Sequence, residues 1–300
     1  MSTYVISDIH GAYDAYMALK AAVNYNSKKD RLYIIGDIFD GNTRYPEDCL
    51  KILDDVIGDN SITLLWGNHE LAHFEYYNAC KHGRADAIKV WNEYLSDPIC
   101  GGSPLLEYFS RHKDKWNYYM DYLRLHPCFS ELIDAEGEAF LLVHGAPVAV
   151  DLASIRNTRD IVSYQYMCLN NTPTFKEDLY AAAVSATALS PDMIADGQIL
   201  ITNAIIEMFE KYGIKDIKCI VGHTPTKFFR EKLREKEKGK ERERKLQRMY
   251  HKNDIYCIDC GCRANSLNNT YAGSVVGSDL CMMKLGKKMK CTYYSKIKEK

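Results

Sequence analysis

A short apolar run that ends in a polar turn constrains the fold of this chain more than any other feature. The run is Ile62-Thr63-Leu64-Leu65, and it is followed by Trp66-Gly67-Asn68-His69-Glu70. An apolar run that stops at glycine and polar residues is typical of a buried strand in a parallel sheet. The same event recurs at residues 4–11, 32–41, 140–146, 218–225 and 255–261. The sequence therefore predicts an α/β protein whose strand ends lie together, which is where ligands bind in open sheets.

The polar side chains that follow these runs are of the types that bind metal ions. Three histidines, at least two aspartates and one asparagine offer nitrogen and oxygen donors, and no thiolate is required. Such a set suits Mn²⁺, Fe or Zn²⁺ and argues against a cysteine-rich structural zinc site. Six side chains exceed what one ion needs if water keeps a position, so two ions roughly 3.5–4 Å apart that share a carboxylate fit better. Any one of these turns, taken alone, is read as an ordinary polar turn.

The segments between the runs predict the organisation of the chain. Helical spacing at 13–25 and 46–57 connects the first three strands, which indicates a parallel sheet with right-handed crossovers. Aromatic and charged residues alternate at helical spacing over about 71–127, so we expect a helical insertion over the strand ends, where specificity is usually set. We interpret the histidines of this insertion as surface or packing residues; they are His73, His82, His112 and His126.

The second half of the chain is less regular. We expect a hairpin from 128–133 and 139–143, helices within 150–213, and a charged, solvated helix or loop at about 230–252. Strand-like segments at 272–276, 280–285 and 289–294 predict antiparallel strands in a second sheet.

The composition excludes some classes of function. The chain has 300 residues, of which 46% are hydrophobic and 26% charged, and a net charge of −1, so its overall charge does not favour binding to nucleic acid or membranes. We see no signal peptide and no apolar run of about 18 residues, and we expect a cytoplasmic protein. The eleven cysteines are then reduced thiols that pack as small hydrophobes, and this includes Cys257, Cys260 and Cys262.

Five motifs, taken in order, resemble those of the calcineurin-like metallophosphoesterases. They are Asp8-Ile9-His10, Gly36-Asp37-Ile38-Phe39-Asp40, Gly67-Asn68-His69-Glu70, His144-Gly145 and Gly222-His223-Thr224. The runs 258–261 and 101–106 further resemble the phosphoprotein-phosphatase branch of this superfamily. The resemblance spans about residues 3–285. It implies a single domain over 1–300, built as a four-layer β-sandwich flanked by helices, with the helical insertion as a cap.

The resemblance also implies a role for each residue of these motifs. Two divalent ions would share the carboxylate of Asp37, and we expect manganese, with iron or zinc as alternatives. The ligands implied for one ion are Asp8, His10 and Asp37, and those for the other are Asp37, Asn68, His144 and His223. His69 would be the general acid that protonates the leaving group, and Asp40 would orient it.

Two departures from the family pattern concern the substrate. Gly41 stands where the phosphatase branch has an arginine after Asp40, and Trp66 stands where an arginine commonly precedes the Gly-Asn-His-Glu run. Bidentate arginine contacts are a large part of phosphate recognition. We therefore expect another cation to bind the phosphate, with Arg44 as the first candidate and Arg159 as the second.

These features are interpreted as a dinuclear metal-dependent phosphoesterase that hydrolyses phosphate monoesters, akin to a bacterial-type serine/threonine protein phosphatase. The alternative enzyme is a dinucleoside polyphosphate or other nucleotide hydrolase, since symmetrical diadenosine tetraphosphatases share the motifs. A further alternative is a metal-stabilised binding protein without turnover. The expected partner is a phosphorylated substrate, either phosphoprotein or nucleotide, with no membrane or nucleic acid involved. The oligomeric state does not follow from the sequence.

Overall fold

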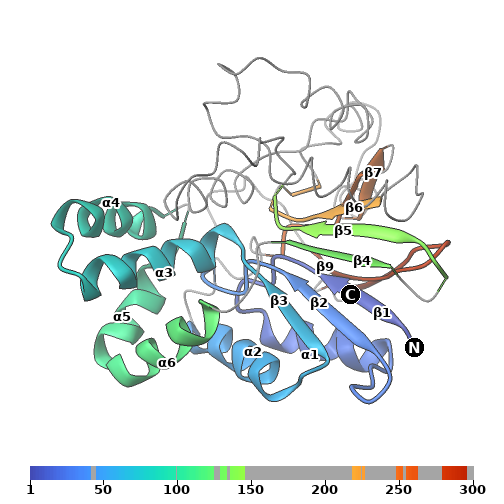
Figure 1. Ribbon diagram of the computed structural model, residues 1–300, viewed down its shortest axis with the longest axis horizontal. Helices are drawn as coiled ribbons and strands as arrows, with labels where there is room; N and C mark the ends of the chain where they lie inside the picture. The colour runs from blue at the N-terminus through green and yellow to red at the C-terminus, as the bar shows by residue number, and fades with distance from the viewer. Residues whose placement is uncertain are drawn as a thin grey trace, which may run out of the picture.

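Two five-stranded sheets lie face to face in the part of the chain that the structure describes (Figure 1). The structure is a computed structural model that describes residues 1–41, 45–98, 100–124, 129–133, 136–145, 218–223, 225–226, 248–252, 255–262 and 279–295. Within these residues, helices cover the outer face of the first sheet, and a group of further helices extends from one end of it (Figure 1). Helices, first sheet and second sheet are thus stacked as layers, as the predicted sandwich requires.

The first sheet has the strand order β10-β9-β1-β2-β3. Its parallel part consists of β1 (Thr3–Ile6), β2 (Arg31–Ile35) and β3 (Ile62–Leu65), which are connected by α1 (Tyr13–Ala22) and α2 (Glu47–Gly58). Two acidic side chains in the first turn of α2 favour the start of that helix, because they interact with its positive end. The predicted unit of three strands and two helices is confirmed.

Side chains of the first sheet alternate between two hydrophobic cores. Ile6 and Leu64 point to the core shared with α1 and α2, whereas Val5 and Leu65 point to the core shared with the second sheet. Because both faces are covered, these strands need apolar residues at nearly every position. This explains the continuous apolar runs in the sequence.

The second sheet has the order β4-β5-β6-β8-β7. β4 (Phe129–Ile133) and β5 (Ala139–Val143) are antiparallel, which confirms the predicted hairpin. β6 (Lys218–Val221) and β8 (Ile255–Cys257) continue the sheet in parallel, and β7 (Tyr250–Lys252) closes it in the antiparallel direction. The carboxyl ends of β5 and β6 therefore lie at the same edge.

Four helices follow β3 and extend to one side of the sheets (Figure 1). They are α3 (Asn68–Lys81), α4 (Ala85–Ser96), α5 (Ser103–Arg111) and α6 (Lys113–Leu123). The indole of Trp66 anchors them to the sheet, since its Nε1 donates to the carbonyl of Leu123 at 2.8 Å. These helices occupy the region where the helical insertion is expected, and its role as a cap over the site stays a prediction.

The C-terminal strands correct one prediction. β9 (Asp279–Lys284) and β10 (Lys290–Ser295) are antiparallel as expected, but β9 pairs with β1 and so extends the first sheet. The prediction that they belong to a second sheet is wrong. β2 occupies only one edge of β1, and the other edge offers unpaired backbone groups that a further strand satisfies. Met282 and Met283 then continue the alternation between the two cores.

Two other expectations fall partly or wholly outside the described residues. Of the charged segment at 230–252, the last three residues form the strand β7 instead of a helix or loop, and residues 230–247 lie outside. The predicted helices within 150–213 and the strand at 272–276 also lie outside. No described helix is long and apolar enough to cross a membrane.

The cysteines behave as the sequence predicts in the part of the chain that is described. None of the described cysteines forms a disulfide bond. Cys257, Cys260 and Cys262 are buried, and Cys260 packs in the core between the two sheets.

Candidate metal centre

The ends of five elements bring the predicted site residues together. These residues are Asp8 and His10 after β1, Asp37 and Asp40 after β2, Asn68 and His69 at the start of α3, His144 after β5, and His223 after β6. The loops after β1 and β2 run side by side, since the N–H of Asp8 donates to the carbonyl of Gly36 at 3.2 Å. The N–H of His10 likewise donates to the carbonyl of Asp37 at 2.9 Å. Backbone hydrogen bonds thus join the two loops at the edge of the sheet.

Left-handed backbone conformations are concentrated at this edge. Among the described non-glycine residues with positive φ, all but Asn24 are predicted site residues: Asp8, His10, Asp37, Asp40 and His223, with φ between 46° and 65°. Each such residue costs about 1–2 kcal/mol relative to the right-handed region. Strain of this kind occurs mainly at functional sites, where the surrounding structure must hold it in place.

The carboxylate of Glu70 holds the loop after β2 in place. One oxygen accepts hydrogen bonds from the N–H groups of Ile38 (2.8 Å) and Phe39 (2.9 Å), and the other accepts from Asp37 (2.8 Å) and Gly67 (2.9 Å). Glu70 is fully buried, so these four charge-assisted bonds replace its hydration. They also fix the strained backbone of Asp37, and with it the direction of the Asp37 side chain.

Two glycines allow this close approach of loops. A Cβ on Gly36 would lie 2.5 Å from the Cα of Gly67, and Gly36 also has a positive φ of 85°. A Cβ on Gly67 would overlap the carboxylate of Asp37. Only glycine fits at these two positions, which gives a physical reason for the glycine in each of the two motifs.

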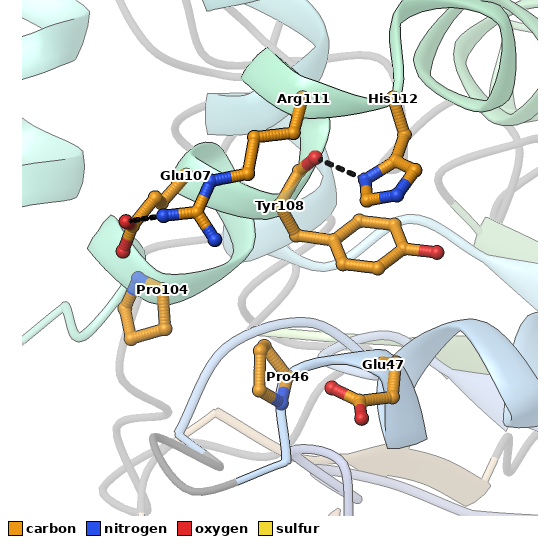
Figure 2. A pocket seen from close by; sticks show the side chains of 7 residues that line it. All are labelled: Pro46, Glu47, Pro104, Glu107, Tyr108, Arg111 and His112. Atoms are coloured by element: carbon orange, nitrogen blue, oxygen red, sulfur yellow. Dashed lines mark hydrogen bonds and ion pairs between the residues drawn. The ribbon is translucent and has the colours of Figure 1, made fainter.

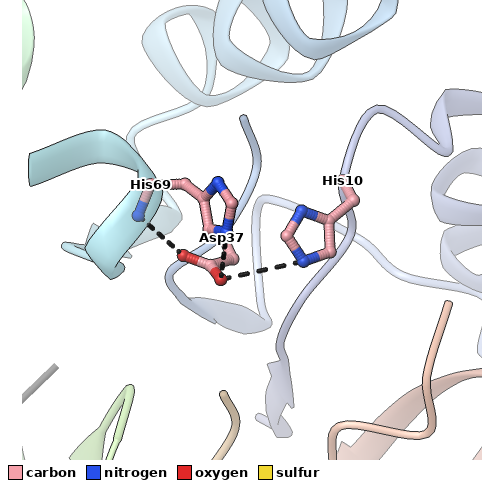
Figure 3. A group of neighbouring side chains, drawn as sticks. All are labelled: His10, Asp37 and His69. Atoms are coloured by element: carbon pink, nitrogen blue, oxygen red, sulfur yellow. Dashed lines mark hydrogen bonds and ion pairs between the residues drawn. The ribbon is translucent and has the colours of Figure 1, made fainter. Parts of the chain in front are cut away.

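The carboxylate of Asp37 lies among three imidazole rings. Its Oδ2 atom is 3.7 Å from Nε2 of His10, 3.7 Å from Nε2 of His69 and 3.3 Å from Nε2 of His144. Figure 3 shows the rings of His10 and His69, both directed at this carboxylate. All four side chains are at most 4% exposed, so these groups interact in a medium of low polarity.

Two of these rings present lone pairs to the carboxylate. Nδ1 of His10 is 2.9 Å from the carbonyl oxygen of Phe39, and Nδ1 of His144 is 2.8 Å from that of Ile35. Because a carbonyl only accepts, each Nδ1 carries a proton, and Nε2 of a neutral ring is then an acceptor. Acceptors that face a carboxylate repel each other unless a proton or a metal ion lies between them. Histidine ligands of metals commonly show this backbone contact, so the donor set fits a divalent ion.

The electric field in the cluster also favours a cation. Burial opposes protonation of His144, but Asp37 and Asp8 raise its pKa to about 9. Burial, followed by the nearby carboxylate of Asp259, raises the pKa of Asp8 well above its ordinary value. The buried carboxylates of Asp8, Asp37 and Asp259 thus lie close enough to repel one another, and divalent ions would reduce this repulsion.

Asp37 belongs to two groups of potential metal ligands. One group is His10, Asp37 and His69, the other is Asp37, His144 and His223, and the ligand atoms within each group lie within 4.8 Å of one another. Asn68 adjoins the second group, with its Oδ1 3.0 Å from Nε2 of His144 and 2.9 Å from Nδ1 of His223. The amide nitrogen of Asn68 donates to the hydroxyl of Tyr94 at 3.1 Å, which directs the oxygen toward the histidines. One carboxylate shared by two groups is the arrangement expected of a two-ion centre.

Asp8 lies beside these groups, and in the described structure it is a member of neither. Its carboxylate accepts hydrogen bonds from the N–H of His223, 3.1 Å from each oxygen, and from the hydroxyl of Ser7. Asp8 therefore ties the loop after β1 to the loop after β6. Its predicted role as a ligand, like the assignment of every other ligand, stays a prediction.

The carboxylate of Asp40 contacts two histidines. Its Oδ2 is 2.7 Å from Nδ1 of His69, and its Oδ1 is 2.7 Å from Nε2 of His73. Burial alone would raise the pKa of Asp40, but His73 and His69 hold it well below its ordinary value. His73 was expected to be a surface or packing residue, and sequence reasoning missed this contact. The available signal was the spacing of four from His69, which places both rings on one face of α3.

Cys100 is a second residue that sequence reasoning missed. Its Sγ lies 3.8 Å from Nδ1 of His69 and 3.9 Å from Oδ2 of Asp40. It directly precedes the Gly101-Gly102 pair that leads into α5, so this motif places a thiol next to the predicted general acid. No sequence pattern around Cys100 indicates this contact, because its partners are remote along the chain.

A pocket lies between the start of α2 and the helix α5 (Figure 2). Its lining residues are Pro46, Glu47, Pro104, Glu107, Tyr108, Arg111 and His112. In Figure 2, Tyr108 faces Pro46 and Glu47 across the pocket, and Arg111 pairs with Glu107 at one side. The pocket is therefore a slot with an aromatic wall and charged groups at its rim. The predicted phosphate-binding residues Arg44 and Arg159 lie outside the described residues.

Replacement of Glu70 tests the anchor of the metal centre. In Glu70→Gln, an NH₂ group replaces one of the two carboxylate oxygens. The two buried backbone N–H groups that donated to this oxygen then lose their acceptor. At about 1–3 kcal/mol for each, the free energy of unfolding should fall by about 2–6 kcal/mol. Elemental analysis of the purified variant should also show reduced metal content. Glu75→Gln on the same helix, at a partly exposed position, is the control and should change neither quantity. Full metal content and stability in Glu70→Gln would contradict the anchoring role.

The sequence was compared with family models and with known proteins. Residues 1–227 match the family model described as calcineurin-like phosphoesterase. The symmetrical bis(5'-nucleosyl)-tetraphosphatase of Buchnera aphidicola is 33% identical over 99 residues, which are 33% of this chain and 34% of that protein. The corresponding protein of Klebsiella pneumoniae is 42% identical over 73 residues, 24% of each chain. The match thus spans about a third, or less, of the length of these curated relatives.

Among solved structures, a cold-active protein-tyrosine phosphatase of a Shewanella species aligns with 98% of this chain and 80% of its own, at 15% identity and a TM-score of 0.45. The family assignment rests on the model match, which extends from the first strand to the turn after β6 and includes all five motifs. It confirms the resemblance found in the sequence and the fold class. The chain belongs to the calcineurin-like phosphoesterase family.

Proposed function

We propose that this protein hydrolyses phosphoric esters at a dinuclear metal centre and that its substrates are nucleotides of the dinucleoside polyphosphate class. The observation that carries the proposal is the carboxylate of Asp37, which is shared by two groups of potential ligands and lies 3.7 Å from the predicted general acid His69. The named relatives are symmetrical bis(5'-nucleosyl)-tetraphosphatases, which favours a nucleotide over a phosphoprotein. The protein-phosphatase interpretation of the sequence therefore becomes the alternative.

Asp37 would hold both ions. Asp8 and His10 would complete the protein ligands of one ion, and Asn68, His144 and His223 those of the other. When bound, two divalent ions neutralise charge on the phosphoryl oxygens and activate water. Manganese suits the mixed carboxylate, amide and imidazole donors, and we propose it as the metal. The backbone contacts of His10 and His144 keep their Nε2 lone pairs available for this purpose.

His69 would donate a proton to the leaving oxygen. Its Nδ1 contacts Asp40 at 2.7 Å, so that nitrogen carries a proton and the carboxylate stabilises a positively charged ring. Its Nε2 faces the carboxylate of Asp37 from the side of the metal centre. A ring held in this way can release the Nε2 proton to substrate without turning.

The slot in Figure 2 would bind part of the substrate that is remote from the reacting phosphate. Pro104 follows Cys100 by four residues, which span at most about 14 Å, and Cys100 contacts Asp40. The slot therefore lies near the centre. A purine that enters between Tyr108 and Pro46 would stack on the tyrosine ring. The phosphates would still need a cation, and Arg44 and Arg159 remain our proposals for it.

A substrate panel tests the proposed function. The purified chain, loaded with Mn²⁺, should release ADP from diadenosine tetraphosphate faster than it releases phosphate from a phosphoserine peptide. A preference for the phosphopeptide would replace the nucleotide proposal with the protein-phosphatase alternative. Retained metal without turnover of any ester, p-nitrophenyl phosphate included, would support a metal-stabilised binding protein instead.

Replacement of His69 tests the general acid. His69→Asn should retain metal, yet kcat should fall by about 10²–10⁴ for esters with poor leaving groups. p-Nitrophenyl phosphate should be affected less, because its leaving group departs without a proton. His82→Asn, at the exposed end of the same helix, is the matched control. An equal loss for both classes of leaving group would exclude His69 as the proton donor.

Replacement of Tyr108 tests the slot. Stacking of a base on an aromatic side chain contributes about 1–3 kcal/mol. Tyr108→Ala should therefore raise KM for diadenosine tetraphosphate by about tenfold, which corresponds to about 1.4 kcal/mol. The KM for p-nitrophenyl phosphate should stay the same, since this small ester does not reach the slot. Tyr118→Ala, on the exposed surface of α6, should change neither value. A KM for the dinucleotide that matches wild type would place the base elsewhere.

A further inference from the structure

The interaction of His73 with Asp40 is not explained by packing alone. Nε2 of His73 lies 2.7 Å from Oδ1 of Asp40, and both side chains are fully buried. The other carboxylate oxygen, Oδ2, lies 2.7 Å from Nδ1 of His69. Two rings, one helical turn apart on α3, thus contact the two oxygens of one carboxylate.

The surroundings of His73 define where its proton lies. Its ring packs edge-on against Phe39 at 5.4 Å and Phe109 at 6.2 Å between centroids. Its Nδ1 is buried and has no hydrogen-bond partner in the described part of the structure. A proton on Nδ1 would be an unsatisfied donor in an apolar environment, which is costly. The contact geometry therefore points to the tautomer with its proton on Nε2, which donates to Asp40.

This contact restricts how Asp40 can move. A carboxylate with a hydrogen bond to only one oxygen can rotate about its Cβ–Cγ bond. In Asp40, both carboxylate oxygens have a histidine partner, and this restricts the rotation. The position of Oδ2 then determines the orientation of the His69 ring. That ring in turn must keep its Nε2 near the metal centre, 3.7 Å from Oδ2 of Asp37. A displacement of Asp40 would therefore also displace Nε2 of His69.

We propose that His73 is a positioning residue for proton transfer, which acts on His69 through Asp40. The proposal rests on the role of His69 under the proposed function. His73 belongs to none of the groups of potential metal ligands among the described residues. It supplies the second hydrogen bond that keeps the carboxylate, and therefore the donor ring, in one orientation. Phe109 of α5 and Phe39 of the loop after β2 hold His73 in turn, so the helical region contributes to the geometry of the acid.

Kinetics of two variants separate this role from a structural one. His73→Leu removes the donor, and His73→Gln can present an amide N–H in place of Nε2–H. With two ions retained per chain, His73→Leu should lower kcat for poor leaving groups by about 10–100-fold, the usual effect of losing a supporting contact. KM should not change, and His73→Gln should recover most of the loss. Loss of metal in both variants, or an equal loss of activity in both, would overturn the proposal.

A double variant tests whether His73 acts through His69. If it does, His69→Asn/His73→Leu should have the same kcat as His69→Asn, because the second change removes support for a ring that is already gone. A purely structural role predicts a further loss in the double variant. If the double variant loses kcat by the product of the two single losses, the proposal is contradicted. If its kcat equals that of His69→Asn, the proposal is supported.

The proton on His73 can be observed without any turnover. In ¹⁵N spectra of the full chain loaded with diamagnetic Zn²⁺, Nε2 of His73 should be protonated and Nδ1 should have the shift of an unprotonated nitrogen. A proton on Nδ1 would overturn the proposal even if the variants fail to fold. This measurement also separates failure of the proposed function from failure of the proposed role of His73. An absence of turnover in wild type contradicts the proposed function, but it does not change the position of this proton.

Discussion

Four backbone N–H groups converge on the carboxylate of Glu70, and the metal centre depends on this contact. The bonds close the loop after β2 onto the start of α3 and keep Asp37 in a left-handed conformation that few residues adopt. They also explain why Glu70 follows Asn68 and His69 so closely: the helix that presents two site residues carries the anchor in its first turn. A single buried side chain thus sets the distance between two motifs that are remote in sequence.

Contacts within the protein orient three histidines of the centre. Backbone carbonyls orient His10 and His144, and Asp40 orients His69. Each contact uses one ring nitrogen and leaves the other directed toward Asp37. Because the rings are buried and already oriented, little reorganisation is required when a cation binds.

Much of this site follows from local sequence, and some of it does not. The run from Ile62 to Leu65 predicts its strand because both faces of the strand are buried by apolar residues. The partner of β9 is not predictable in this way, since the choice between two sheet edges is made by residues far apart in the chain. The role of His73 was missed for the same reason. Its burial depends on Phe39 and Phe109, and its spacing of four from His69 does not by itself identify Asp40 as its partner.

The hydrogen bond between Asp8 and the backbone of His223 joins residues 215 positions apart. Contacts of such separation form late, because the chain between them must first be ordered. The two ligand groups differ in this respect. His10, Asp37 and His69 belong to the first sheet and the helix that follows it, whereas His144 and His223 come from the second sheet. One half of the centre is therefore complete within the first seventy residues of the chain, while the other half exists only after the two sheets have docked.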